Sequence, residues 1–229
     1  MRLSAKGVRE VLARRGVDAL YHANTVTTAC TFLSQDALLS RGNVEDQGLQ
    51  QTPQASDSID KKRRIWRDVF LDAVDIHARI NRRNYYGPIL FVLDLDLLIR
   101  TPVETVWVTK KNPTEWISRE PRSHRFFRSL EEFEQTYMLG DFGSMLMLRD
   151  TGGQLTLHGN TRRIIVDDPG PLTLTSSQID VFPPAMKALR RSAQAGGLRY
   201  LRIQRRDCKE WCGCHDQYRT YPFDTRRWF

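Results

Sequence analysis

The chain has 229 residues and a formal net charge of +8, with 40% hydrophobic and 27% charged residues. This length and composition predict a globular protein, most simply one domain, and exclude a largely disordered chain. No segment approaches the roughly 20 apolar residues of a membrane-spanning helix, and the N-terminal segment lacks the apolar centre of a secretion signal. We therefore expect a cytoplasmic protein that does not contact a membrane.

The positive charge comes mainly from arginine, in clusters such as "KKRR", "NRR" and "RIQRR" that are spread along the chain. Guanidinium groups form paired hydrogen bonds with phosphates and stack on nucleobases. This pattern favours a nucleic acid or another polyanion as a partner, and a solvated basic surface is the alternative.

The first part of the chain is expected to be mostly helical. Apolar residues recur at helical spacing between residues 26 and 38, after a capping Asn24 or Thr25 and before a terminating Gly42. The expected elements are a basic helix over 1–16, a strand over 17–21, a helix from 24 or 25 to 42, a polar loop over 43–60 and a mainly helical segment over 61–84.

The remainder is expected to be richer in strands. Ser129 and Glu132 form a capping box at the start of one helix, and Gly152–Gly153 marks a bend or a hairpin turn. The expected elements are strands over 88–99, 103–110, 144–157, 161–168 and 198–206, and helices over 129–141 and 183–197. This order predicts an α+β fold with a mixed sheet, as one domain over 1–229 with a basic, cysteine- and aromatic-containing extension over 185–229.

The stretch "LYHANTVTTACTFLSQDALLSRG" places His22 and Asn24 where a strand gives way to a helix that ends in "ALLSRG". This unit resembles the first motif of the ADP-ribosyltransferase superfamily. The likeness is strongest to DarT-type enzymes, which modify nucleic acid, and to the RNA-directed phage-defence toxin CmdT. In that family a histidine on the first strand hydrogen-bonds the nicotinamide-side ribose of NAD, so the resemblance implies that His22 donates to that ribose.

Two later stretches extend the resemblance. In "DKKRRIWRD", Arg63 and Arg64 fall where the family has its NAD-binding and catalytic arginine. "YYGPILFV", with Tyr85 and Tyr86, falls where a family segment leads into a strand, and Tyr21, Tyr85 or Tyr86 can stack on nicotinamide. The resemblance implies NAD as co-substrate, with cofactor-binding residues Tyr21, His22, Asn24 and Tyr86.

The catalytic acid is the point of departure from the family pattern. The place of the family's glutamate falls on "DFGSMLML", where Ser144 occupies the Glu position and Asp141 is the nearest upstream carboxylate. Either Asp141 substitutes, or the alignment slips, or the acid has been lost. The resemblance therefore implies Arg63, Arg64 and Asp141 as catalytic residues. Their chemistry suits the reaction, because a guanidinium binds pyrophosphate and a carboxylate stabilises an oxocarbenium-like state.

No metal is expected at this site. Two clusters of residue types that can bind metals lie elsewhere in the sequence. The first cluster lies at close spacing on the expected helix and consists of Asp68, Asp72, Asp75 and His77. These residues could form a metal site or an acid–base set, or they could pair with nearby arginines. The second cluster lies beside His215 and consists of Cys208, Cys212 and Cys214. It could bind zinc, or its members could be reduced thiols without a metal.

The C-terminal segment interleaves arginines with aromatic rings, which suits single-stranded nucleic acid or docking to an acidic antitoxin. We expect a toxin-like transferase that moves ADP-ribose from NAD onto RNA or single-stranded DNA, in phage defence, with a cognate antitoxin protein. The alternatives are a non-catalytic nucleic-acid-binding module and an ADP-ribosyltransferase that acts on a protein.

Overall fold

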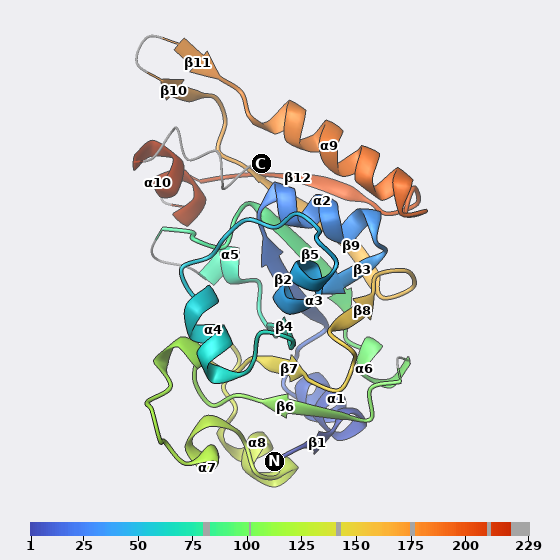
Figure 1. Cartoon of the computed structure of the whole chain (residues 1–229), viewed down its shortest axis with the longest axis vertical. Coiled ribbons are helices and arrows are strands. Elements are labelled where there is room, and N and C mark those ends of the chain that lie inside the picture. Colours follow the sequence, from blue (N-terminus) through green and yellow to red (C-terminus); the bar gives the residue numbers. More distant parts are fainter. Residues whose placement is uncertain (80–82, 101, 141–142, 175–176, 210–211, 221–229) are drawn as a thin grey trace.

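Two four-stranded sheets form the centre of the fold, one above the other in Figure 1. The computed structural model describes residues 1–79, 83–100, 102–140, 143–174, 177–209 and 212–220. Helices and strands both contribute to the structure, which confirms the predicted α+β class.

The upper sheet has the strand order β12-β9-β5-β2. Its strands are β2 (Ala19–Asn24), β5 (Ile89–Asp94), β9 (Thr161–Asp168) and β12 (Ile203–Asp207). β12 runs parallel to β9, and the other pairs are antiparallel. β5 is central, which explains its uninterrupted apolar sequence "ILFVL", because both of its faces are buried.

The lower sheet has the order β1-β6-β7-β4 and is antiparallel throughout. Its strands are β1 (Leu3–Ser4), β4 (Val69–Leu71), β6 (Thr105–Val108) and β7 (Leu146–Leu148). β4 pairs with β7 up to Leu71, and the next residue, Asp72, pairs with Tyr21 of β2. The two sheets are therefore joined one residue before His22.

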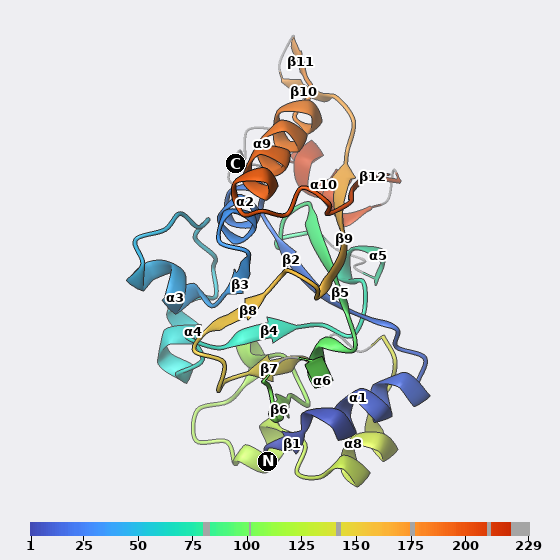
Figure 2. The ribbon, with the colours of Figure 1, turned by 90° about the vertical axis from the view of Figure 1, so that its right-hand side faces the viewer.

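Helices cover the sheets at both ends of the molecule (Figures 1 and 2). α2 (Val26–Ser34) packs against α9 (Phe182–Ala195) beside the upper sheet, and α1 (Ala5–Arg14) packs against α6 (Leu97–Arg100) and α8 (Leu130–Thr136) beside the lower one. The remaining elements are α3 (Arg41–Asp46), α4 (Asp57–Arg63), α5 (Ile76–Arg79), η1 (Pro113–Glu115), α7 (Arg122–Arg125), α10 (Gly213–Thr220) and the strand pairs β3 (Ala37–Leu39) with β8 (Gln154–Thr156) and β10 (Leu172–Leu174) with β11 (Ser177–Ile179).

Two of the expected helices were wrong in extent. The helix expected to reach Gly42 ends at Ser34, and the buried run over 37–39 pairs instead with β8. Within the described part of the segment over 61–84, only residues 61–63 and 76–79 are helical, since Arg64 has a left-handed φ of 59° and residues 69–71 form β4. In both cases pairing with a strand distant in sequence overrides the local helical pattern.

Several expected elements are confirmed. β5, β6, β9 and α8 lie within their expected ranges, and α9 begins one residue before its expected start, at Phe182. The side chain of Ser129 accepts from the Glu132 amide at 3.2 Å. Gly152 and Gly153 both lie in a turn with positive φ, but the flanking strands do not pair with each other. β7 joins β4 and β6, whereas β8 joins β3.

Gly87 holds the loop before β5 against the end of β2. Its φ is +111°, and an added Cβ would lie 2.4 Å from the carbonyl oxygen of Asn24. Gly87→Ala should therefore lower the free energy of unfolding by about 2–3 kcal/mol in urea denaturation. Gly48→Ala is the matched control, because Gly48 has a φ of +63° with open space around it and should lose only about 1 kcal/mol. Equal losses in the two variants would contradict this packing.

Candidate functional site

His22 lies within β2, two residues before the strand ends at Asn24. Its Nδ1 atom is 2.8 Å from the carbonyl oxygen of Phe70, and its Nε2 atom is 3.3 Å from the Asn24 side-chain amide nitrogen. A carbonyl oxygen can only accept, so Nδ1 carries the proton and Nε2 accepts from Asn24. Burial lowers the pKa of His22, which keeps the ring neutral at neutral pH.

This tautomer corrects the expected role of His22. Because Nδ1 holds the single proton, Nε2 has none to donate to a ribose hydroxyl. A hydroxyl that replaced the Asn24 amide would instead donate to Nε2. The ring also packs against Phe32 and Phe91, with centroid distances of 5.7 and 6.5 Å, so its orientation is fixed.

Asn24 links His22 to the start of α2. Its side-chain oxygen accepts from the Thr25 amide at 3.0 Å, while its amide group faces His22. Thr25 caps α2, and its hydroxyl is 2.7 Å from that of Thr52. The Thr52 amide donates to Thr28 at 3.0 Å, so the polar loop after α3 is bound along α2 by side-chain hydroxyls.

The same loop is held from its other side by Arg41. The guanidinium pairs with Asp57, with Nε 2.7 Å from Oδ1, and donates to the Thr52 carbonyl at 3.0 Å. Both charged groups are largely buried, which makes this a stronger contact than a surface ion pair. No role was expected for Arg41 or Asp57 from the sequence, although Arg41 lies in the "ALLSRG" phrase.

The tyrosines lie on the opposite face of β2 from His22. Neighbouring residues on a strand point to opposite faces, and Tyr21 and Tyr86 both pack against the cluster of Val74, Ile76 and Leu90. Tyr85 is exposed. The structure therefore brings His22 together with Asn24, and Tyr21 together with Tyr86, but not the four residues into one group.

Arg63 and Arg64 end α4. The guanidinium of Arg63 donates to the carbonyl oxygen of Trp116, and the exposed Arg64 has left-handed backbone geometry and a carbonyl that accepts from Arg149 at 2.8 Å. In the described part of the chain no contact joins either arginine to His22. Arg63 is engaged with the loop around η1, whereas the side chain of Arg64 faces solvent.

The carboxylates expected from the sequence do not form one cluster in the part of the chain that the structure describes. Asp141 lies outside the described residues, and Ser144 is buried. Asp68 pairs with Arg149 at 3.1 Å and Asp75 with Arg206 at 2.5 Å, which confirms the ion-pair alternative for these two. They do not share a helix face with Asp72, because the segment contains β4.

A further carboxyl, that of Asp72, lies close to the same strand although the sequence did not predict it as part of this site. Its backbone exchanges two hydrogen bonds of 2.8 Å with Tyr21, at the junction of the two sheets. Burial raises its pKa to about 7. A carboxyl with such a pKa can hold or release a proton near neutral pH, which suits general acid–base chemistry.

A search with protein-family models found no match to this sequence, and a comparison with curated protein sequences found none either. Over the described ranges, none of the helices combines the length and the apolar composition needed to span a bilayer.

The pKa of Asp72 makes stability depend on pH. A carboxyl with a pKa of about 7 in the folded chain and about 4 in the unfolded chain destabilises the fold as pH rises through this interval. Asp72→Asn should therefore increase the free energy of unfolding by about 4 kcal/mol at pH 8 relative to its effect at pH 4, because each of the roughly three pKa units contributes about 1.36 kcal/mol. Denaturant unfolding across this range measures the difference.

Asp18→Asn is the control, because the Asp18 carboxylate is 84% exposed. It should leave the pH dependence of the wild-type chain unchanged. If both variants follow the wild-type profile, the Asp72 carboxyl is not protonated in the folded chain at neutral pH.

Proposed function

We propose that this chain is an ADP-ribosyltransferase that moves ADP-ribose from NAD onto a base of RNA or single-stranded DNA. In this reaction the bond between the ribose C1′ and the nicotinamide nitrogen breaks, and nicotinamide leaves. C1′ then bonds to a nucleophilic atom of the base, whose proton passes to a carboxylate. The observation that carries the proposal is the fixed, neutral His22 on β2 beside the junction of the two sheets.

His22 suits the binding of a ribose. Its Nε2 atom is an acceptor held in place by the bond from Nδ1 to Phe70, so it can accept from a ribose hydroxyl without reorienting. The adjacent Asn24 amide, 3.3 Å away, can bind a second oxygen of the same ribose. A neutral acceptor also avoids placing another positive charge beside the oxocarbenium-like ribose.

Two carboxylates can serve as the proton acceptor in this proposal. Asp141 is nearest in sequence to the position that the family resemblance assigns, and Asp72 lies at the sheet junction with a pKa of about 7. Ser144 supplies no negative charge. Asp72 shares a face with Tyr21 rather than with His22, so its role requires that the substrate reach across the edge of β2.

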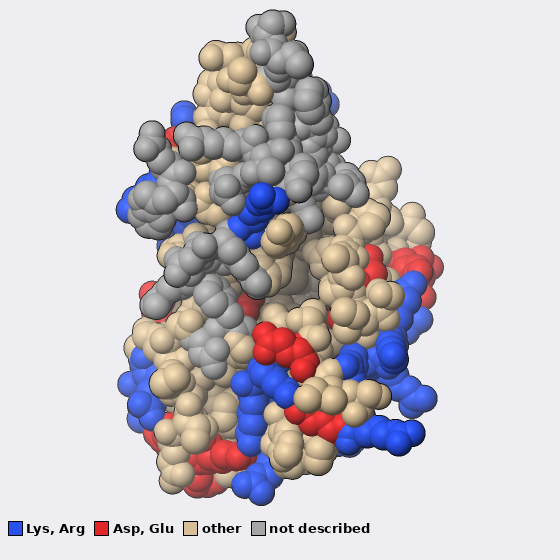
Figure 3. Space-filling view, turned by 90° about the vertical axis from the view of Figure 1, so that its left-hand side faces the viewer, with Lys and Arg blue, Asp and Glu red and all other residues tan. Residues whose placement is uncertain are grey.

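The surface supports a nucleic acid as the acceptor. Basic side chains, interspersed with acidic ones, lie on the face shown in Figure 3, which is hollowed near its centre. A separate open recess of about 630 Å³ lies between α9, β12 and the residues that precede β10 and follow β11. Lys187, Arg190 and Arg191 line it from one face of α9, and none of them forms an ion pair with another described residue.

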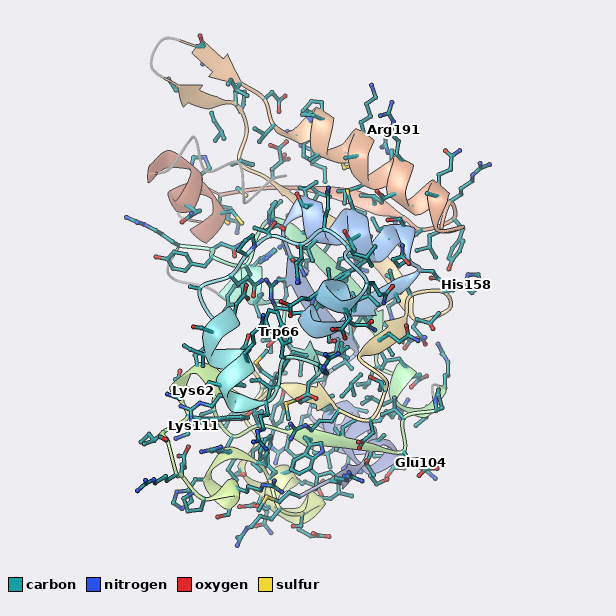
Figure 4. All side chains as sticks on the ribbon, viewed as in Figure 1. Lys62, Trp66, Glu104, Lys111, His158 and Arg191 are labelled. Atoms are coloured by element: carbon teal, nitrogen blue, oxygen red, sulfur yellow. The ribbon has the colours of Figure 1, made fainter. Side chains whose placement is uncertain are left out.

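These cations are available to phosphates. All three are exposed, and Arg191 projects from α9 into solvent, away from the part of the molecule that carries Lys62 and Lys111 (Figure 4). Phe182 and Met186 add apolar surface to the same recess, on which a base can pack. An acidic antitoxin is a further partner that this surface fits, and a role in phage defence follows from the family resemblance.

A non-catalytic nucleic-acid-binding protein is the second candidate. It is favoured by Ser144 at the position where the family has its glutamate. An ADP-ribosyltransferase that modifies a protein is the third, and the experiment below separates the three.

His22→Ala should reduce the transfer of labelled ADP-ribose to nucleic acid by about 10- to 100-fold, because the variant lacks the ribose acceptor. The purified chain is incubated with NAD labelled on its adenylate phosphate and, separately, with RNA, single-stranded DNA and a protein extract. His158→Ala is the matched control, since His158 is exposed and contacts Tyr200 rather than the site (Figure 4).

Label on protein alone would support the third candidate. Absence of label from every acceptor, with the wild-type chain folded and binding RNA, would support the non-catalytic protein. If transfer occurs, Asp72→Asn and Asp141→Asn identify the carboxylate that accepts the proton. Only the variant without that carboxylate should lose about 100-fold or more in the rate of transfer.

Reversing two charges in the recess should weaken RNA binding. Arg190→Glu with Arg191→Glu should lower the affinity for single-stranded RNA about tenfold or more and flatten the salt dependence by about 1.4 in the slope of log K against log salt. Fluorescence anisotropy at several salt concentrations measures both. The control is Arg2→Glu with Lys6→Glu, which makes the same charge change near α1, at the other end of the molecule (Figure 1). An equal loss of RNA affinity in the two double variants would show that RNA does not bind in the recess.

A further inference from the structure

Three of the four cysteines converge where β12 leads into α10. Cys208 follows β12, Cys212 precedes α10 and Cys214 lies in its first turn. All are free thiols, and their Sγ atoms lie within 4.8 Å of one another. A tetrahedral zinc ion with Zn–S bonds of about 2.3 Å holds its sulfurs about 3.8 Å apart, so small side-chain movements would close the triangle around one ion.

Groups from distant parts of the chain surround these sulfurs. The Asn84 side-chain amide donates to the Sγ atom of Cys214 at 2.8 Å, and the Asn84 backbone amide donates to the Gly213 carbonyl at 2.9 Å. The Cys208 amide donates to the Asp168 carbonyl at 2.9 Å. An N–H donor directed at sulfur stabilises a thiolate, and such outer contacts orient the ligands of metal sites.

The charges around the cluster also fit a bound cation. Asp167 is buried, with its Oδ2 atom 3.6 Å from the Cys214 sulfur and 2.5 Å from Nδ1 of His77. Arg206 pairs with both Asp167 and Asp75 at 2.5 Å. Three thiolates around a divalent ion leave a net charge of −1, and the guanidinium of Arg206 offsets part of the negative charge gathered here.

We propose that Cys208, Cys212 and Cys214 bind one zinc ion that fixes the start of α10 to the end of β12. Binding releases the three thiol protons and forms three Zn–S bonds, with no change of oxidation state. Thiolates select soft or borderline metals. A four-cysteine iron–sulfur cluster is excluded within one chain, because the fourth cysteine, Cys30, lies on α2 against α9.

The fourth coordination position is left for water or another ligand. His215 follows Cys214 directly but does not belong to the group of mutually close ligand atoms in the described part of the chain. Zinc is bound in proteins with three ligands and an open position as well as with four.

The site also connects to the end of β2. Asn84 donates to the Gly87 carbonyl at 2.9 Å, and the backbone of Gly87 packs against Asn24. Zinc bound by Cys214 would therefore stabilise the loop beside Asn24, whether or not the chain transfers ADP-ribose.

The metal content of the full-length chain, purified under reducing conditions without added metal, tests the proposal. We expect about one zinc per chain by mass spectrometry, and X-ray absorption at the zinc edge should show three sulfurs at about 2.3 Å. Cys212→Ser should lose the zinc. This variant is preferred because Cys212 is half-buried, whereas Cys214 is part of the core. Cys30→Ser is the matched control and should retain it.

Three results would overturn the proposal. The first is a wild-type chain with only trace zinc after incubation with zinc chloride and a reductant. The second is a disulfide within the trio, or copper in place of zinc, in the chain as isolated. The third is unchanged zinc content in Cys212→Ser. Circular dichroism establishes that each variant is folded, and the measurements on the wild-type chain decide the matter if Cys212→Ser does not fold.

Discussion

Two backbone hydrogen bonds between Tyr21 and Asp72 join the sheets of this protein, and the candidate site depends on them. They bring β4 alongside β2, which places the Phe70 carbonyl within 2.8 Å of His22. That contact assigns the proton of His22 to Nδ1 and leaves Nε2 as an acceptor. Asp72 lies at the same junction, and burial raises the pKa of its carboxyl to about 7.

The end of β2 is supported from two further directions. Thr25 and Thr52 bind the polar loop along α2, and the Arg41–Asp57 pair holds the far side of that loop. On the other side, Gly87 packs against Asn24. The side-chain amide of Asn84 donates both to the Gly87 carbonyl and to the sulfur of Cys214 at the start of α10. A zinc ion at those cysteines would thus stabilise the proposed NAD site through a single short loop.

Local sequence patterns predicted the helices and strands whose formation depends mainly on residues close together in the sequence. The buried run of β5, the amphipathic α9 and the Ser129 cap of α8 need no distant partner to be recognised. β3 and β4 were missed because their short apolar runs become strands only by pairing with β8 and β7, which lie more than 70 residues away. Without β4, neither the sheet junction nor the position of Asp72 could be predicted.

For the same reason, only part of the geometry of the candidate site could be predicted from the sequence. His22 and Asn24 are close in sequence on one strand, so their contact follows from local structure. Tyr21 was assigned to the same group, but the alternation of side chains along β2 puts it on the opposite face. The engagement of Arg63 with Trp116 depends on a long-range contact that the spacing of residues does not reveal.

The central claim is that Nε2 of His22 accepts from the ribose of NAD. The most direct test is a two-dimensional proton–nitrogen NMR spectrum of the histidine rings, recorded while NAD is added to the full-length chain. The free protein should show His22 as a neutral Nδ1–H tautomer, and its Nε2 resonance should shift saturably with NAD while that of His158 does not. A His22 ring protonated at Nε2, or His22 resonances that stay unchanged at saturating NAD, would contradict the account.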